Sequence, residues 1–140
     1  MLSARLAAPL NNRFEKGQVL IEFALVLPLL LLLLFGIIEF GRAFFQKNMT
    51  INAAREGARF AAVQTTWDIG RITAAARVPI TPASLKSGAL VVIVPQSKPS
   101  TGGSVQVTVT TGFKTMLPRL ILPLGASTGI SASATMRYEH

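Results

Sequence analysis

The chain has 140 residues, no cysteine, one histidine and a formal net charge of +8. Without cysteine it has no disulfide framework, no thiolate metal site and no thiol nucleophile. The basic residues are scattered from Arg5 to Arg137, with no dense run and no interleaved aromatic residues, which argues against a partner made of nucleic acid. The six carboxylates and the terminal His140 offer few groups for chemistry, so we expect no enzyme, no cofactor, no metal ion and no small-molecule substrate.

The first 17 residues form a short basic leader. It contains three basic residues, Arg5, Arg13 and Lys16, and one acidic residue, Glu15. Residues 19–38 then have the sequence VLIEFALVLPLLLLLLFGII, which at about 1.5 Å per residue is long enough to cross a hydrocarbon core of about 30 Å. A positive flank stays on the cytoplasmic side when an apolar helix inserts after it. These features predict a transmembrane helix with a cytoplasmic N-terminus.

A secretory signal peptide has the same order of a basic and then an apolar region. Its apolar region is usually shorter, and a cleavage site of small residues follows it. Here the apolar run is followed by Glu39, Phe40, Gly41 and Arg42, whereas a small residue, Gly17, stands before it. The pattern therefore favours a retained membrane anchor.

Glu22 lies inside this apolar run. An ionised carboxylate without a partner costs several kcal/mol in hydrocarbon. The residue therefore indicates a partner or a function, unless its side chain reaches the headgroups from a position near the helix end.

The string KGQVLIEF at residues 16–23 resembles the prepilin-peptidase site of type IV pilin-like proteins. In that pattern a glycine closes a basic leader, and a glutamate stands fifth in the mature chain before an aromatic residue. The resemblance implies cleavage between Gly17 and Gln18 on the cytoplasmic side, and roles in processing or assembly for Glu22 and Phe23. The new amine of Gln18 can then meet Glu22 of a neighbouring subunit.

Three segments in this order, EFALVLPLLLLLLFGIIEFGRA, INAAREGARFAAV and the closing ATMRYE, resemble the TadE-like family of pseudopilins from tight-adherence (Flp-type) pilus systems. The resemblance covers about residues 16–64 and the last ten or so. It implies a non-catalytic minor pilin or pseudopilin of a type IV pilus used in surface attachment. The alternative is a single-pass membrane-anchored binding module that keeps its N-terminus.

The same resemblance implies a location and partners. The protein would lie in the bacterial inner membrane, with its C-terminal domain on the extracytoplasmic side. Its partners would be the prepilin peptidase, the inner-membrane assembly platform, the major pilin and other pseudopilins, besides the lipid bilayer.

After the leader (1–17) we expect a long helix over residues 18–64. Pro28 should bend it, because proline cannot donate to the carbonyl of Ala24 and its ring crowds that turn. Further along, small residues three and four apart form a smooth stripe that another backbone can approach closely. Either a second subunit or the chain's own domain packs on this stripe, which comprises Ala54, Gly57, Ala58 and Ala61.

Residues 65–140 are expected to form a small α+β domain. IGRITAAAR has helical spacing after Asp68, LVVIV at 90–94 is β-branched, and SVQVTVT at 104–110 alternates strictly. The last strand, ISASATMRYE, places five residues on one face: Ile130, Ala132, Ala134, Met136 and Tyr138.

The expected fold class is therefore α+β: a long N-terminal transmembrane helix, followed by a short helix and a three-stranded antiparallel sheet. One segment fits this scheme poorly. Residues 113–125 are apolar but broken by Pro118 and Pro123. We expect this segment to pack in the core; the alternative is an exposed contact patch.

Overall fold

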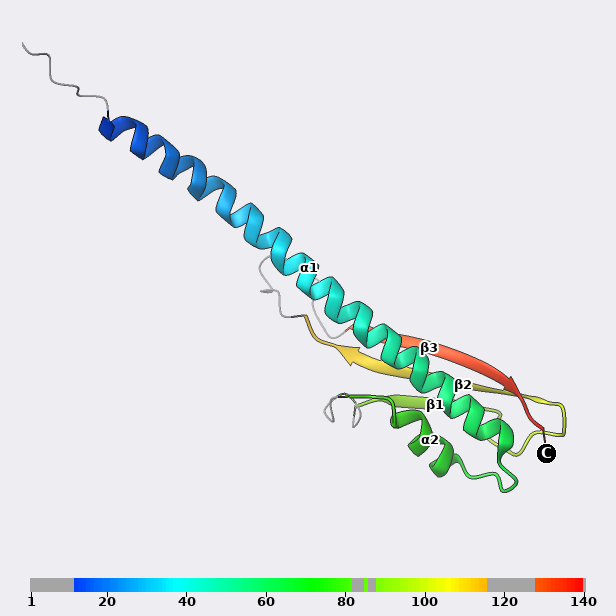
Figure 1. The fold of residues 1–140 in the computed structure, drawn as a ribbon. Helices are drawn as coiled ribbons and strands as arrows, with labels where there is room; N and C mark the ends of the chain where they lie inside the picture. Colours follow the sequence, from blue (N-terminus) through cyan, green and yellow to red (C-terminus); the bar gives the residue numbers. More distant parts are fainter. Residues whose placement is uncertain (1–11, 82–84, 86–87, 116–127, 140) are drawn as a thin grey trace, which may run out of the picture. The chain divides into compact units, whose positions relative to one another are not determined.

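The computed structural model describes residues 12–81, 85, 88–115 and 128–139 (Figure 1). Its elements are α1 (Asn12–Val63), α2 (Ile69–Arg77), β1 (Leu90–Val94), β2 (Ser104–Phe113) and β3 (Thr128–Arg137). This set of helices and strands confirms the expected α+β class. The first eleven residues of the expected leader, and the apolar segment 113–125 beyond Thr115, lie outside the described residues.

The chain divides into two compact units, Met1–Ile38 and Glu39–His140. The second unit begins well before residue 65, where the sequence placed the start of the distal domain. The reason is that the second half of α1 supplies core residues to this unit.

The described part of the first unit is the N-terminal portion of α1. The helix begins at Asn12, ahead of Gly17, and continues through Pro28 without interruption. The long apolar side chains from Val19 to Ile38 are exposed. α1 is long and apolar enough to cross a membrane, and its most apolar window has no buried residues.

The second unit contains a three-stranded sheet of order β1-β2-β3, antiparallel throughout. Alternation along β2 places Val105, Val107 and Val109 on one face, where all three are fully buried. β1 is an edge strand whose Leu90, Val92 and Val94 are exposed. The residues expected to share a face of β3 pack on the core at Ala132, Ala134 and Met136, and Tyr138 just beyond the strand is buried there.

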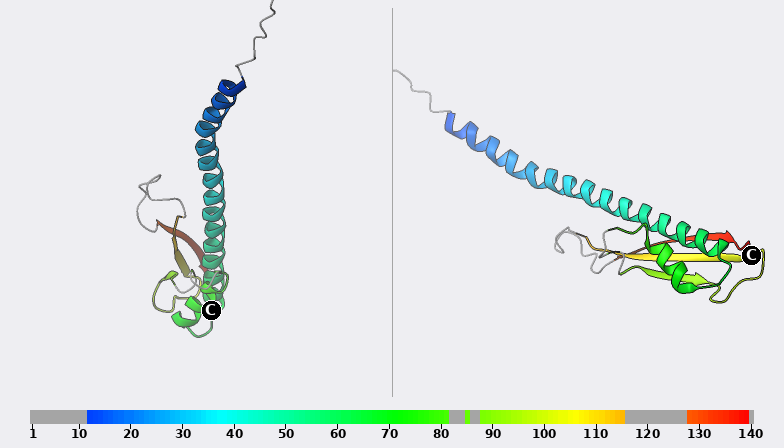
Figure 2. Two further views of the ribbon diagram at one scale, coloured as in Figure 1. Left: turned by 90° about the vertical axis from the view of Figure 1, so that its left-hand side faces the viewer. Right: turned by 60° about the horizontal axis from the view of Figure 1, so that its bottom comes forward.

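The core lies between the buried face of the sheet, the second half of α1 and the short helix α2. Figures 1 and 2 show the second half of α1 running alongside the sheet. α2 begins after Asp68, whose side chain caps it by accepting from the backbone N–H of Arg71 at 3.1 Å. Ile72 and Ala76 of α2 are fully buried.

The small-residue stripe of α1 faces this core. Ala54, Ala58 and Ala61 are fully buried. At Gly57 the approach is closest, because a Cβ atom there would lie 2.8 Å from Cβ of Ala76 and 3.0 Å from Cγ1 of Val107. Of the two alternatives for the stripe, the structure therefore has the chain's own α2 and β2 packed against it.

We predict that Gly57→Ala destabilises the domain. Alanine favours a helix over glycine by about 1 kcal/mol, but its methyl group would overlap Ala76, and overpacking of this kind costs about 1–3 kcal/mol. Gly41→Ala in the same helix is the matched control, because a Cβ atom at Gly41 meets nothing within 4 Å. The measurement is urea unfolding of the detergent-solubilised full chain, followed by fluorescence of its single tryptophan, Trp67.

The two variants should shift the unfolding midpoint in opposite directions, Gly57→Ala downwards and Gly41→Ala slightly upwards. An upward shift for both would mean that α1 can move away from α2 at little cost.

Candidate functional site

The residues of the expected processing site lie together at the start of α1. Gln18 is one helical turn from Glu22, and its Nε2 donates to Oε1 of Glu22 at 3.4 Å. The side chains of Glu22 and Phe23 are exposed. In the described part of the chain, the ion pairs are Glu39–Arg42 and Glu56–Arg59, so Glu22 has no cationic partner there.

This arrangement leaves the carboxylate of Glu22 with a neutral neighbour on an otherwise apolar helix surface. A long hydrogen bond from an amide supplies part of the solvation that an ionised carboxylate needs, but no opposite charge. The exposed carboxylate of Glu22 therefore has no opposite charge beside it in the described part of the chain.

Further along α1, Glu56 and Arg59 form an exposed ion pair on the AREGAR element. Nε of Arg59 donates to Oε2 of Glu56 at 3.1 Å, and Nη2 donates to Oε1 at 2.7 Å. The hydrogen bonds from Arg59 lower the pKa of Glu56 below its ordinary value, against the opposing effect of partial burial. Because the pair is exposed to solvent, it contributes little to stability.

The pair lines a shallow groove of about 620 Å³ together with an apolar wall. That wall includes Phe60 of α1 and Ala75, Val78 and Pro79 at the end of α2. The AREGAR element thus has one small-residue face turned to the core and one charged face turned outwards.

We predict that the Glu56 pKa returns to the ordinary glutamate range in Arg59→Gln. Since the folded-state pKa is lowered, the stabilisation from Glu56 is present above its unfolded-state pKa and is lost as the pH falls through the folded value. A ¹³C NMR titration of the side-chain carboxyl group would measure both values. An unchanged pKa in the variant would exclude Arg59 as the cause.

The closing ATMRYE segment connects the end of β3 to the end of α1 through hydrogen bonds and ring contacts. Tyr138 is fully buried, and its hydroxyl donates to the carbonyl of Gln64 at 2.7 Å. Its ring stands edge-on to Trp67, with centroids 6.0 Å apart. The next residue, Glu139, donates its backbone N–H to the carbonyl of Ala62 at 3.2 Å. Two carbonyls at the C-terminal end of α1 are thereby satisfied by the last residues of the chain.

A second polar connection joins α1 to the other end of β2. Nε2 of Gln46 donates to Oγ1 of Thr111 at 2.9 Å and to the carbonyl of Gly112 at 3.0 Å. Thr50 shares a hydrogen bond of 2.9 Å with Thr111, and its hydroxyl donates to the carbonyl of Gln46 at 2.8 Å. All three side chains are buried, so the network fixes the position of α1 along the sheet.

The sequence interpretation did not include either connection. A signal for the first was available, because Tyr138 continues the apolar face of the last strand. Gln46 and Thr50 are one helical turn apart, a spacing that indicates a shared face, but nothing in the sequence identifies Thr111 as their partner.

Residues 17–59 match the TadE-like protein family model. The match begins at Gly17 of the expected cleavage site and ends at Arg59 of the AREGAR element; it covers neither α2 nor the sheet. The comparisons with curated proteins and with solved structures found no match.

The TadE-like match confirms the resemblance over residues 17–59, whereas the closing ATMRYE segment lies outside it. It points to Tad (Flp) pilus systems and to a family that is generally structural rather than catalytic. The apolar helix and this family together support a membrane-anchored protein. Within the described residues, no group of three or more His, Cys, Asp or Glu side chains could hold a metal ion.

We predict that Tyr138→Phe destabilises the protein by about 1–2 kcal/mol, because the buried carbonyl of Gln64 loses the tyrosine hydroxyl as its donor. The aromatic ring and its contact with Trp67 are kept, so the change isolates the hydrogen bond. Urea unfolding followed by Trp67 fluorescence would measure the difference. Stability equal to that of the wild type would show that another donor, such as water, replaces the hydroxyl.

Proposed function

We propose that the protein is a minor pilin or pseudopilin that takes part in assembly of a tight-adherence (Flp-type) pilus. Residues 19–38 anchor it in the bacterial inner membrane, with the N-terminus in the cytoplasm and the C-terminal domain on the extracytoplasmic side. A prepilin peptidase cleaves it between Gly17 and Gln18. The observation that carries the proposal is Glu22, a carboxylate without a cationic partner in the described residues, on an exposed apolar helix.

Cleavage supplies the missing charge. A new amine at Gln18 is cationic at neutral pH, and in an assembly it can approach Glu22 of the next subunit. Within an apolar bundle an unmatched carboxylate costs several kcal/mol, so correct pairing selects the correct axial position of one helix against another. The pair acts on specificity of docking more than on total stability.

The peptidase must reach a bond that lies within α1. Gly17 favours access, because glycine destabilises a helix by about 1 kcal/mol relative to alanine and carries no side chain to obstruct a protease. A Cβ atom at Gly17 would meet nothing within 4 Å, so packing inside the protein does not explain why glycine is there.

Burial of the small-residue stripe supports one choice of assembly surface. Ala54, Ala58 and Ala61 already contact the chain's own core, which leaves the apolar surface between Val19 and Ile38 for contacts with neighbouring helices. The partners proposed on this basis are the major pilin, other pseudopilins and the inner-membrane assembly platform.

The deciding experiment measures the intact mass of the chain purified from membranes, with and without an active prepilin peptidase. The expected mature chain begins at Gln18 when the peptidase is active and at Met1 when it is not. Gly17→Val should stay uncleaved in both strains, because the added side chain blocks the site.

Glu22→Gln tests the role in assembly separately. It should be cleaved normally but recovered with pilus components at less than about one tenth of the wild-type level, the factor that corresponds to about 1.4 kcal/mol. Glu139→Gln, which removes a carboxylate at the opposite end of the chain, is the matched control and should behave as wild type. A wild-type chain that keeps Met1 beside the active peptidase would contradict the proposal and favour a tethered binding module.

A further inference from the structure

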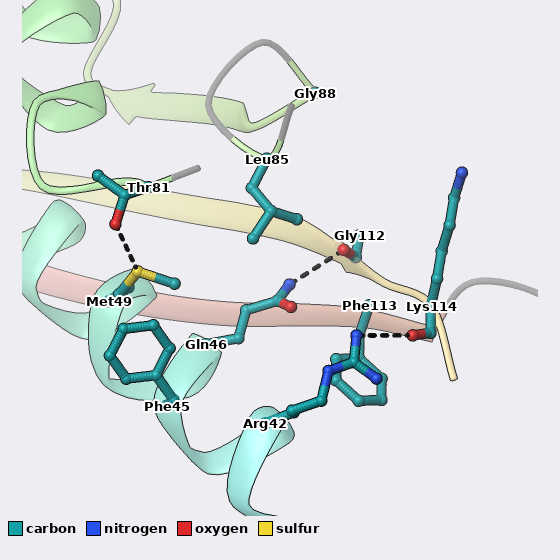
Figure 3. A pocket seen from close by; sticks show the side chains of 10 residues that line it. All are labelled: Arg42, Phe45, Gln46, Met49, Thr81, Leu85, Gly88, Gly112, Phe113 and Lys114. Atoms are coloured by element: carbon teal, nitrogen blue, oxygen red, sulfur yellow. Dashed lines mark hydrogen bonds between the residues drawn. The ribbon is translucent and has the colours of Figure 1, made fainter. Parts of the chain in front are cut away.

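The unit Glu39–His140 contains a hollow of about 600 Å³ close in sequence to the apolar run (Figure 3). α1 contributes one wall and the end of β2 another; residues between α2 and β1 contribute the third. The lining residues are Arg42, Phe45, Gln46, Met49, Thr81, Leu85, Gly88, Gly112, Phe113 and Lys114. Only three residues separate Ile38, the end of the apolar run, from Arg42.

The walls of the hollow are mainly apolar, and its charges are cationic. Phe45, Met49, Leu85 and Phe113 provide the apolar surface, and none of the described lining residues is acidic. The guanidinium of Arg42 lies 5.6 Å from the ring centroid of Phe113. Figure 3 shows Arg42 beside the ring of Phe113 and the backbone carbonyl of Lys114, with the Lys114 side chain extending away from the guanidinium.

Arg42 is held in place by groups that leave part of its guanidinium exposed. Nη1 donates to Oε2 of Glu39 at 2.7 Å, and Nη2 donates to the carbonyl of Lys114 at 3.5 Å. The side chain of Arg42 keeps 38% of its accessible surface. It can therefore receive an anion without losing these contacts, since a guanidinium has five N–H donors.

Gln46 adds a polar group on the wall of the hollow. Its side chain is 6% exposed, and its Nε2 is used by Thr111 and Gly112. These two hydrogen bonds hold the amide against the end of β2, so that Gln46 forms a fixed part of the wall.

We propose that this hollow binds one anionic glycerophospholipid of the bilayer. Its phosphate contacts the exposed part of the Arg42 guanidinium, the Lys114 side chain adds a second positive charge at the rim, and the glycerol and upper acyl methylenes contact the apolar walls. The positive charge and the apolar walls of the lining match this ligand class. The proposal rests on the membrane span of the proposed function, but not on cleavage at Gly17.

The position of the hollow supports a lipid rather than a soluble anion. Phe40 and Phe44 stack on α1 with centroids 6.4 Å apart, and both are exposed directly after the apolar run. Exposed aromatic residues beside basic residues at the end of a span are typical of the membrane–water interface. In a chain anchored through residues 19–38, Arg42 follows the end of the apolar run by about one helical turn.

The test uses the full chain purified in a mild detergent and incubated with equal amounts of phosphatidylglycerol and phosphatidylcholine. Native mass spectrometry measures which lipid stays bound, for both the cleaved and the uncleaved chain. We expect one phosphatidylglycerol per chain, retained at least tenfold over phosphatidylcholine in both forms.

Two pairs of variants separate a built site from general adsorption. Arg42→Gln with Lys114→Gln should reduce phosphatidylglycerol retention about tenfold or more, because each basic group near a lipid surface contributes about a fivefold factor. Arg55→Gln with Arg71→Gln removes the same charge elsewhere and should change retention less than twofold. Phe45→Ser should weaken retention, whereas Phe44→Ser should not, although both phenylalanines are 61% exposed and only Phe45 lines the hollow.

Equal retention of the two lipids would overturn the proposal. It would also be overturned if either control variant lost as much phosphatidylglycerol as the matched variant with changes in the hollow. Equal retention would also be the outcome if a second copy of the chain or the chain's own residues beyond Lys114 occupied the hollow. A chain that binds the lipid but is never cleaved would leave the site intact and contradict only the pilin assignment.

Discussion

The approach of α1 to the sheet and α2 at Gly57 is the constraint on which the folded unit depends. With two heavy atoms within about 3 Å of where a side chain would begin, the helix has no room for a larger residue at that level. The alanines on either side, from Ala54 to Ala61, extend the smooth surface over about two turns. Alanine and valine make up most of the core, so one helix face and the nine residues of α2 can cover the small sheet closely.

Polar contacts at the two ends of this segment of α1 fix its position along the helix axis. A smooth apolar surface alone would not fix that position. Gln46 and Thr50 hold the near end against Thr111, and Tyr138 holds the far end through the carbonyl of Gln64. Smooth small-residue surfaces can slide with little change in contact, whereas buried hydrogen bonds tolerate little displacement. The domain therefore combines nonspecific burial in the middle with specific bonds at both ends.

Much of this architecture could be predicted from the sequence because the relevant signals are local. The apolar run, the alternation in SVQVTVT and the helical spacing of IGRITAAAR each depend on neighbours within a few residues, and the observed α2 and β1 coincide with the expected segments. The partner of the small-residue stripe could not be predicted, since a second helix and the chain's own sheet require the same smooth face. The bonds from Gln46 to Thr111 and from Tyr138 to Gln64 span 65 and 74 residues, and no local pattern encodes them.

The candidate functional residues also divide into those that a local motif indicates and those that only the fold brings together. Gly17 and Glu22 were found because their spacing resembles a processing motif, whereas the hollow beside Arg42 joins three segments that are distant in the sequence. Its lining residues have no common spacing in the sequence. The combination of apolar walls and basic residues arises only when the fold brings Phe113 and Lys114 beside α1.

The attachment of Tyr138 and Glu139 to the end of α1 has a consequence for cooperativity. The bond from Tyr138 to the carbonyl of Gln64 joins the end of β3 to the end of a helix 74 residues earlier, and the backbone of Glu139 repeats the connection at Ala62. Fraying of the last strand would therefore break hydrogen bonds at the end of α1 as well, so the two ends should open together in one event rather than separately.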